Sequence, residues 1–305
     1  MPASALMNVM VAAARKAGRS LARDFGEVEQ LQVSVKGPGN FVSAADHKAE
    51  EIIFKELSKA RPGYGFLMEE RGEVEGVDKT HRWIVDPLDG TTNFLHGIPH
   101  FAISIGLERE GALVAGVVYN PATDELFAAE KGKGAYLNDR RRLRVAARKT
   151  LADAVVVTGI PHRGRPGHPG FMKEMQAVMM EVAGLRRSGS AALDLAYIAA
   201  GRYDGYWERN LKPWDLAAGI VLIVLAPTAT LRWASAVYTV TGLLLFAVSA
   251  TYHLVQWNEV VSRVLKRLDH TNIMLVIAGT YTPLSLALLA PDRARVLLTL
   301  VWVGA

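Results

Sequence analysis

The most informative residues of the sequence are two carboxylates, Asp86 and Asp89, which stand three positions apart. They belong to the stretch WIVDPLDGTTNF at residues 83–94, directly after a short apolar strand pattern. Pro87 restricts the turn between them, so both side chains can be held in one place. Carboxylate oxygens beside a backbone carbonyl are the ligands that Mg²⁺ prefers in proteins. The pair therefore predicts a magnesium site.

The residues after this pair add a place for a phosphate group. Gly90 lets the backbone approach a ligand closely, and the amides of Gly90 and Thr91 open the next expected helix. A helix N-terminus favours a bound phosphate. The alternative is an ordinary surface turn, because Asp and Gly are common in turns, and a lone D-x-x-D-G segment favours that alternative.

Further acidic residues decide between these alternatives. They lie in three separate segments: Glu69 and Glu70 in FLMEERG, Asp46 in NFVSAADHKAE, and Asp215 in PWDLAAG. Carboxylates that converge on divalent cations are what a metal-dependent phosphomonoesterase needs, because the cations stabilise charge on the phosphate ester. The combination favours a catalytic metal site over a turn.

With these motifs the chain resembles the inositol monophosphatase family, over about residues 1–220. The resemblance implies a set of metal ligands, which by position are Glu69, Asp86, the carbonyl of Leu88, Asp89 and Asp215. It also implies two or three Mg²⁺ ions and a metal-activated water as the nucleophile. Glu69 and Thr91 are the residues that would orient this water.

The same resemblance implies substrate contacts and supporting residues. The positions that contact the substrate are Gly90, Thr91, Gly189, Ser190, Ala191 and Glu208. Asp46 falls behind the ligands or at a third metal, and Lys36 lies in a glycine-rich loop within expected reach of the phosphate. The expected reaction is Mg²⁺-dependent hydrolysis of a small phosphomonoester, above all inositol monophosphate or a similar phosphorylated polyol or sugar. A homodimer is implied as well.

Alternating helical and strand patterns must position these residues. Helices are expected at Ala45–Arg61 and Ala191–Ala200, and paired strands at Phe101–Leu107 and Ala112–Tyr119. This alternation indicates a mixed α/β or α+β domain. The resemblance narrows the expectation to an α+β layered (αβαβα) sugar-phosphatase-like domain at residues 1–219, truncated at its carboxyl end.

The composition excludes several kinds of function. The sequence has no cysteine, which excludes disulfides, thiolate metal sites and cysteine nucleophiles. Its net charge is +5, but no run of Lys and Arg is interleaved with aromatic residues, so no specific nucleic-acid site is predicted. The amino terminus lacks the basic segment and long apolar run of a secretory signal.

The character of the sequence changes after Asp215. Three uncharged runs follow, at residues 216–231, 233–258 and 271–291. A helix that spans a bilayer needs roughly 20 apolar residues, so the last two runs qualify and the first is marginal. The sequence therefore predicts a helical transmembrane fragment at residues 220–305, with two or three spans.

This second part resembles the hemolysin III branch of the progestin and adipoQ receptor family, through SATYH, KRLDH and IAGTYTP. In that family such motifs contribute to a zinc site, and the matching residues here are Ser249, His253 and Asp269. The C-terminal His pair of the family is absent. The three residues are therefore interpreted as the remnant of a zinc site, with too few ligands to hold zinc.

The basic loop at residues 256–270 indicates its orientation. Lys and Arg are enriched in cytoplasmic loops, so the loop is expected in the cytoplasm. With the marginal run as a first pass, the catalytic domain is also cytoplasmic, in a membrane-associated protein. Two alternatives stay open: a hemolysin III-type membrane protein that carries the phosphatase part as a passenger, and an inactive fusion product.

Overall fold

The computed structural model describes residues 4–27, 33–37, 40–162, 166–226, 251, 260–268, 278, 282, 285 and 291–303. The chain separates into two compact units, Met1–Ala226 and Pro227–Ala305. Each unit is described by itself below.

An eight-stranded sheet forms the centre of the first unit. Its strand order is β10-β9-β8-β7-β6-β5-β3-β4, and all neighbours are antiparallel except β3 and β5. The strands are β3 (Tyr64–Met68), β4 (Gly72–Val74), β5 (Asp78–Asp89), β6 (Ala102–Arg109), β7 (Ala112–Asn120), β8 (Glu125–Glu130), β9 (Gly134–Leu137) and β10 (Arg141–Arg142).

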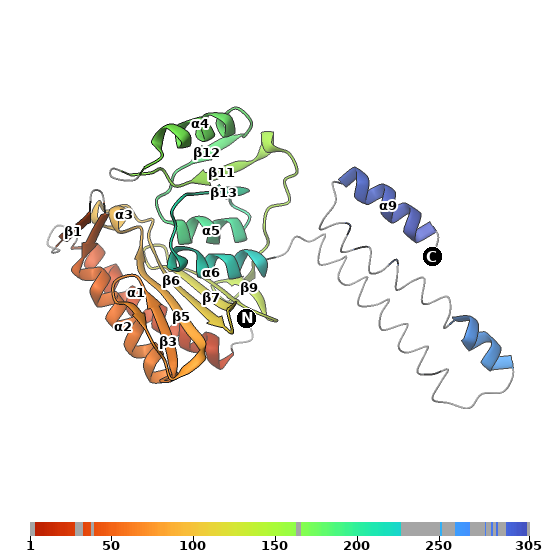
Figure 1. Cartoon of the computed structure of the whole chain (residues 1–305), viewed down its shortest axis with the longest axis horizontal. Coiled ribbons are helices and arrows are strands. Elements are labelled where there is room, and N and C mark those ends of the chain that lie inside the picture. Colours follow the sequence, from red (N-terminus) through yellow and green to blue (C-terminus); the bar gives the residue numbers. More distant parts are fainter. Residues whose placement is uncertain are drawn as a thin grey trace. The chain divides into compact units, whose positions relative to one another are not determined.

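Two long helices, α1 (Ala5–Phe25) and α2 (Ala44–Ala60), cover one face of this sheet and pack against each other (Figure 1). Ser4 caps α1 by accepting a hydrogen bond from the Met7 N–H. Ser43 caps α2 in a reciprocal arrangement with Asp46, so both helices begin where the sequence supplies a cap. The apolar sides of both helices form one core with the sheet.

Helices α5 (Ala191–Ala199) and α6 (Pro213–Val224) pack against each other on the opposite face of the sheet. Their small buried residues form the second core, together with the other face of β7 and β8. Beyond them lies a parallel three-stranded sheet in the order β12-β11-β13, followed by α4 (Figure 1). These elements are β11 (Val155–Thr158), α4 (His168–Met179), β12 (Gly184–Arg186) and β13 (Gly205–Trp207).

The layers of the first unit are therefore helices, sheet, helices, sheet and helix. This confirms the layered α+β architecture that the resemblance implied. Three short elements complete the unit: the hairpin β1 (Val33–Gly37) and β2 (Asn40–Ser43), the 3₁₀ turn η2 (Leu151–Asp153), and α3 (Thr91–Leu95).

Helix α6 lies on the sheet at unusually short range. A Cβ atom added at Gly106 of β6 would stand 2.8 Å from the Cβ of Ala217, and one added at Gly116 of β7 would stand 2.7 Å from the Ala218 oxygen. Five residues of α6 are thereby part of a core: Ala217, Ala218, Gly219, Val221 and Leu222. The part of the uncharged run 216–231 that α6 contains is thus a core helix of the first unit and not a bilayer span.

In the second unit the structure describes a helix at residues 260–268 and the helix α9 (Pro291–Val303). Trp302 Nε1 donates a hydrogen bond of 3.0 Å to Thr282 Oγ1, which in turn donates to the Ala278 carbonyl. Within the described residues no helix combines the length and the apolar character needed to cross a membrane. The runs at 233–258 and 271–291 fall largely outside the described residues.

Candidate active site

The two carboxylates of the central motif share one side of the sheet because β5 contains a bulge. Asp86 pairs with Ser104 of β6, and Asp89 pairs with Ala102, so three steps along β5 face two steps along β6. In a regular strand, residues three apart point to opposite faces, and one extra residue reverses this. The bulge therefore turns Asp89 to the side on which Asp86 lies.

Asp86, Asp89 and Asp215 form one cluster, in which a carboxylate oxygen of each lies within 4.8 Å of the others. Asp86 is buried, and the other two are half-buried. Burial raises the pKa of Asp86 well above its ordinary value, and the negative charges of Glu69, Asp89 and Asp215 raise it further. The pKa of Asp89 is raised in the same way, by burial first and by Asp215 next. Three carboxylates held this close repel one another unless a cation or proton compensates them.

The hydrogen bonds around two of these carboxylates keep one oxygen of each engaged with protein. Ser190 Oγ donates to Asp89 Oδ2 at 2.5 Å, and the Ala192 N–H donates to the same oxygen at 2.7 Å. The Leu88 N–H donates to Asp86 Oδ1 at 2.9 Å. Orientation by such bonds favours presentation of the remaining oxygens to a ligand.

Asp215 reaches the cluster from the first turn of α6. The Lys212 N–H donates to its Oδ2 at 2.7 Å, so the side chain caps the helix that carries it. Ser104 Oγ of β6 donates to the Trp214 carbonyl at 3.1 Å. The start of α6 is thus hydrogen-bonded to Ser104, the residue of β6 that pairs with Asp86.

Thr91 stands at the start of α3, next to the cluster. Its hydroxyl lies 3.0 Å from Asp46 Oδ1 and 3.1 Å from the Leu88 carbonyl, and these two acceptors share its single proton. Asp46 is fully buried, and burial raises its pKa. Since the proton of the Thr91 hydroxyl points to these acceptors, its oxygen can accept a hydrogen bond from a water.

Glu69 follows directly after β3, next to the strand that carries Asp86. Its N–H donates to the Val85 carbonyl at 3.2 Å, which continues the pairing of β3 with β5. Its charge acts on Asp86, as the pKa of Asp86 shows. The structure thus brings Glu69, Asp86, Asp89, Thr91 and Asp215 into one region.

The loop before α5 packs closely against the central motif at two glycines, Gly189 of the loop and Gly90 of the motif. Gly90 and Gly189 have φ of +92° and +91°, the left-handed region that glycine adopts most readily. A Cβ at Gly90 would stand 3.2 Å from the Gly189 oxygen, and a Cβ at Gly189 would stand 3.0 Å from Asn93 Nδ2, so a side chain at either position would be in tight contact. The Asn93 amide completes the link, since its Nδ2 donates to the carbonyls of His100 and Ser188.

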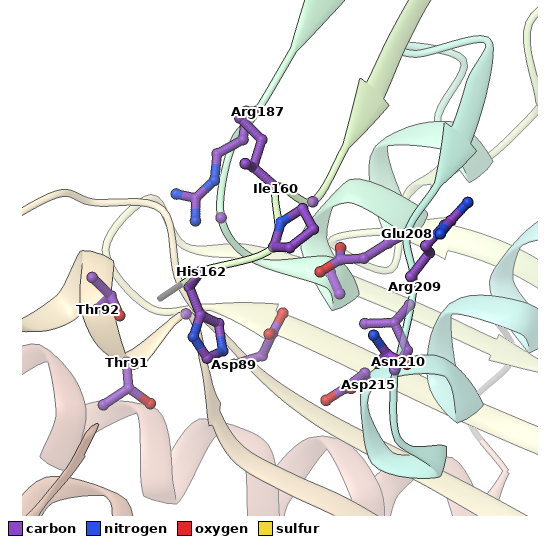
Figure 2. A pocket seen from close by; sticks show the side chains of 16 residues that line it. Asp89, Thr91, Thr92, Ile160, His162, Arg187, Glu208, Arg209, Asn210 and Asp215 are labelled. Carbon is purple, nitrogen blue, oxygen red and sulfur yellow. The ribbon is translucent and has the colours of Figure 1, made fainter. Parts of the chain in front are cut away.

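A cavity of about 200 Å³ opens above the acidic cluster (Figure 2). Its lining includes Gly90, Thr91, Gly189, Ala191 and Glu208, together with Asp89 and Asp215. Glu208 accepts a hydrogen bond of 2.7 Å from the Tyr206 hydroxyl, and burial raises its pKa. Among the expected substrate contacts, Ser190 stands apart: it is buried, and its hydroxyl is bonded to Asp89.

Sequence reasoning missed several residues that line the cavity. His162 lines the cavity and points into it in Figure 2. Arg187 also lines it, with a guanidinium nitrogen 2.9 Å from the position of a Cβ on Gly189. Arg187 stands two positions before Gly189, so its proximity to a motif was a usable signal. His162 offered no such signal, because the path of its loop depends on tertiary structure.

Four residues singled out in the sequence cannot be placed. The side chain of Lys36 lies outside the described part of the structure, although its backbone belongs to β1. Ser249, His253 and Asp269 also lie outside the described residues. The remnant of a zinc site therefore stays a prediction.

The donor set of the cluster fits a hard divalent cation. All three side chains offer carboxylate oxygens, and within the described residues no other group of three His, Cys, Asp or Glu converges in this way. Burial first, and repulsion from neighbouring carboxylates next, raise the pKa values of Asp86 and Asp89, and bound positive charge would counter both effects. Oxygen ligands of this kind suit Mg²⁺ better than softer metals.

Comparisons with known proteins agree with this geometry. The model of the inositol monophosphatase family matches residues 3–228, and the model described as haemolysin-III related matches residues 214–305. The inositol-1-monophosphatase of Mesorhizobium japonicum is 70% identical over 223 residues, which are 73% of this chain and 84% of that protein. The Nus factor SuhB of Vibrio cholerae is 46% identical over 214 residues, or 70% of this chain and 80% of that protein.

A solved structure is similar over the same part of the chain. The crystal structure of the extragenic suppressor protein suhB from Bartonella henselae superposes with a TM-score of 0.71 at 65% identity. The match covers 73% of this chain and 85% of that chain.

Proposed function

This chain belongs to the inositol monophosphatase family and is a phosphomonoesterase, and from that premise we propose that its first unit hydrolyses inositol monophosphate, or a closely similar phosphorylated polyol, with Mg²⁺ as cofactor. The observation that carries the proposal is the convergence of Asp86, Asp89 and Asp215 at a cavity of suitable size. The 70% identical relative named inositol-1-monophosphatase supports the choice of substrate.

We assign the ligands as the resemblance implied: Glu69, Asp86, Asp89, Asp215 and the Leu88 carbonyl. When bound there, Mg²⁺ supplies positive charge that stabilises the phosphoryl oxygens and favours ionisation of water. Glu69 and Thr91 orient the attacking water, since Thr91 already donates its own proton to Asp46 and Leu88 and presents a lone pair.

Recognition of the polyol falls to the opposite side of the cavity. Gly189 has no side chain and Ala191 has only a methyl group, so neither blocks the ring of a polyol in the cavity. Glu208 can accept hydrogen bonds from the hydroxyl groups of the polyol. Gly90 and Thr91 border the place of the phosphate. A polyol with several hydroxyl groups satisfies these acceptors better than a simple alkyl phosphate does.

The proposal predicts phosphate release from inositol-1-phosphate by the purified full chain, in the presence of Mg²⁺ and not in the presence of EDTA. Asp89→Asn keeps an oxygen for the bonds from Ser190 and Ala192 but removes the charge, so we expect kcat to fall by about a hundredfold or more. Asp153→Asn, in an exposed turn, is the matched control and should retain full activity. Activity that persists in Asp89→Asn, or that needs no divalent cation, would contradict the proposal.

We also propose that the part of the chain beyond α6 is membrane-associated and of hemolysin III type, and that it follows a catalytic domain that includes α6. The match of residues 214–305 to the haemolysin-III related model and the uncharged runs support this. Cell fractionation tests it: the chain should sediment with membranes and be released by detergent but not by high salt. Recovery of intact chain in the high-speed supernatant without detergent would contradict it.

A further inference from the structure

Glu50 is a buried carboxylate that no step of the proposed reaction uses. It lies on α2, and only 3% of its surface is exposed. Burial of a carboxylate is costly unless hydrogen bonds compensate it, and burial raises the pKa of Glu50. Its compensating partners indicate what it does.

The partners of Glu50 are the two backbone amides that follow Glu69. Glu50 Oε2 accepts from the Glu70 N–H at 2.9 Å and from the Arg71 N–H at 3.3 Å. Its other oxygen, Oε1, lies 3.8 Å from Arg71 Nε. Both amides belong to the turn that connects β3 to β4.

This turn is held on its other side as well. The Glu69 N–H donates to the Val85 carbonyl of β5, one residue before Asp86. Glu69 is thus bracketed by a backbone bond to the strand that carries the acidic motif and by the two bonds that Glu50 accepts. The backbone at Glu69 is therefore held from both directions, which fixes the position from which its side chain extends.

The same helix face holds Thr91. Asp46 stands one helical turn before Glu50, so both side chains project from the same side of α2. Asp46 accepts from the Thr91 hydroxyl at 3.0 Å, while Glu50 accepts from the turn after Glu69. Helix α2 therefore contacts both residues to which the orientation of water is assigned.

We propose that Glu50 is a positioning residue, which sets the place of Glu69 relative to Thr91 by anchoring the Glu70–Arg71 amides to α2. The inference rests on the proposed function, because it concerns the role assigned to Glu69. It adds to that function a determinant outside the cavity, one helix away from the reacting groups.

Two substitutions separate the reach of the side chain from its charge. Glu50→Gln keeps an oxygen at the same distance from the backbone, so it can still accept from both amides. Glu50→Asp keeps the charge but is shorter by one methylene and withdraws from them. The control is Glu51→Gln, since Glu51 also pairs with Arg71 but is only half-buried and has no hydrogen bond to the turn amides.

We expect Glu50→Asp to lower kcat for inositol-1-phosphate by about tenfold or more, as loss of a group that orients a metal ligand does, with KM changed less than about twofold. The rise in Tm that Mg²⁺ causes should shrink in the same variant. Glu50→Gln should stay within about threefold of the unmodified chain in kcat, because its reach is preserved. Glu51→Gln should match the unmodified chain in every measurement.

A double-mutant cycle with Glu69→Gln shows whether Glu50 acts through Glu69. If it does, Glu50→Asp has little further effect on the residual kcat or on the Mg²⁺-induced shift in the Glu69→Gln chain. An undiminished tenfold effect there overturns the inference, as does Glu50→Gln proving worse than Glu50→Asp. A Glu50→Asp chain that does not fold without metal also overturns it, because Glu50 is then a general stability residue.

Failure of the proposed function has a different signature. In that case the unmodified chain shows neither Mg²⁺-dependent phosphate release nor a Mg²⁺-induced rise in Tm. A chain that passes both tests while Glu50→Asp behaves like the unmodified chain retains the function and loses only the role of Glu50.

Discussion

The carboxylates of the first unit differ in what their surroundings do to their charge. Burial and like charges raise the pKa of Asp86 and Asp89, which prepares them for a cation. Glu125 shows the opposite case. Hydrogen bonds from Arg202, followed by the positive charge of Arg202 and a hydrogen bond from the Tyr197 hydroxyl, outweigh burial and lower the pKa of Glu125. The sign of each shift therefore reports whether burial and like charges, or bonds to a cation, dominate the surroundings of the carboxylate.

Glu125→Gln tests this difference through the pH dependence of stability. The folded-state pKa of Glu125 lies below its ordinary value of 4.5, so its contribution is fully present above that pH and is lost as pH falls through the lowered pKa. We expect the variant to lose about 1–3 kcal/mol of unfolding free energy at pH 7, the range for hydrogen bonds to charged groups. Urea unfolding between about pH 7 and pH 3 should show the loss shrinking below the ordinary value.

The control for this experiment is Glu181→Gln, at an exposed position after α4. Its unfolding free energy should parallel that of the unmodified chain across the whole pH range. A loss in Glu125→Gln that stays constant down to pH 3 would show that the ion pair with Arg202 is not its source.

The identity of the site residues could be predicted from sequence, whereas their geometry could not. Asp86 and Asp89 stand in a recognisable motif, yet nothing in their spacing reveals the bulge that aligns them. The Gly90–Gly189 contact and the role of Glu50 were also invisible, because each joins segments far apart in the sequence. The local sequence pattern predicts which residues form the site, whereas contacts between distant segments determine how those residues are oriented.

Secondary structure elements followed the sequence closely where their periodicity was clear. The helix expected at Ala45–Arg61 is α2, Ala44–Ala60, and the helix expected at Ala191–Ala200 is α5, Ala191–Ala199. The strand before the acidic motif is much longer than its apolar core suggested, since β5 begins at Asp78. Its first half is polar and lies exposed or half-buried beside the end of β6, so no apolar pattern is required there.

Helix α6 can carry Asp215 to the cluster only because the sheet beneath it lacks side chains at two points. Gly106→Ala should therefore push α6 away from β6, because the new methyl carbon would stand 2.8 Å from the Cβ of Ala217. We expect a loss of about 1–3 kcal/mol of stability from overpacking, together with a lower kcat as Asp215 shifts. Chemical denaturation and the phosphate-release assay measure the two effects.

Gly63→Ala is the matched control for this substitution. A Cβ at Gly63 would stand 3.6 Å from Asp78 Cβ, an ordinary contact distance, and the position is remote from α6. Its stability and kcat should stay close to those of the unmodified chain. An equal effect of both alanines would show that close packing under α6 does not position Asp215.

At the scale of the whole molecule, the two family matches overlap at residues 214–228, which include most of α6. The structure assigns this helix to the first unit, whose last backbone bond joins the Val145 N–H to the Ala226 carbonyl. The uncharged character of the helix could not distinguish a core helix from a bilayer span. Contacts with Gly106 and Gly116 make that distinction.

The separation into two units predicts that Mg²⁺ acts on only one of them. Binding stabilises the folded first unit by about 2.7 kcal/mol at a concentration 100-fold above the dissociation constant, so amide exchange by global opening there should slow about a hundredfold. Amides beyond Pro227 should exchange at an unchanged rate. Hydrogen exchange of the detergent-solubilised full chain measures both, and equal slowing in both units would contradict the prediction.

The bulge in β5 limits the genetic changes by which such a metal site can evolve. In a regular strand, residues three apart lie on opposite faces, so Asp86 and Asp89 share a face only because the bulge lets three residues of β5 oppose two of β6. Substitutions alter which side chain stands at a position but leave this count unchanged. A lineage can therefore tune the metal site by point mutation, whereas the bulge itself is gained or lost through a change in the number of residues between the paired positions.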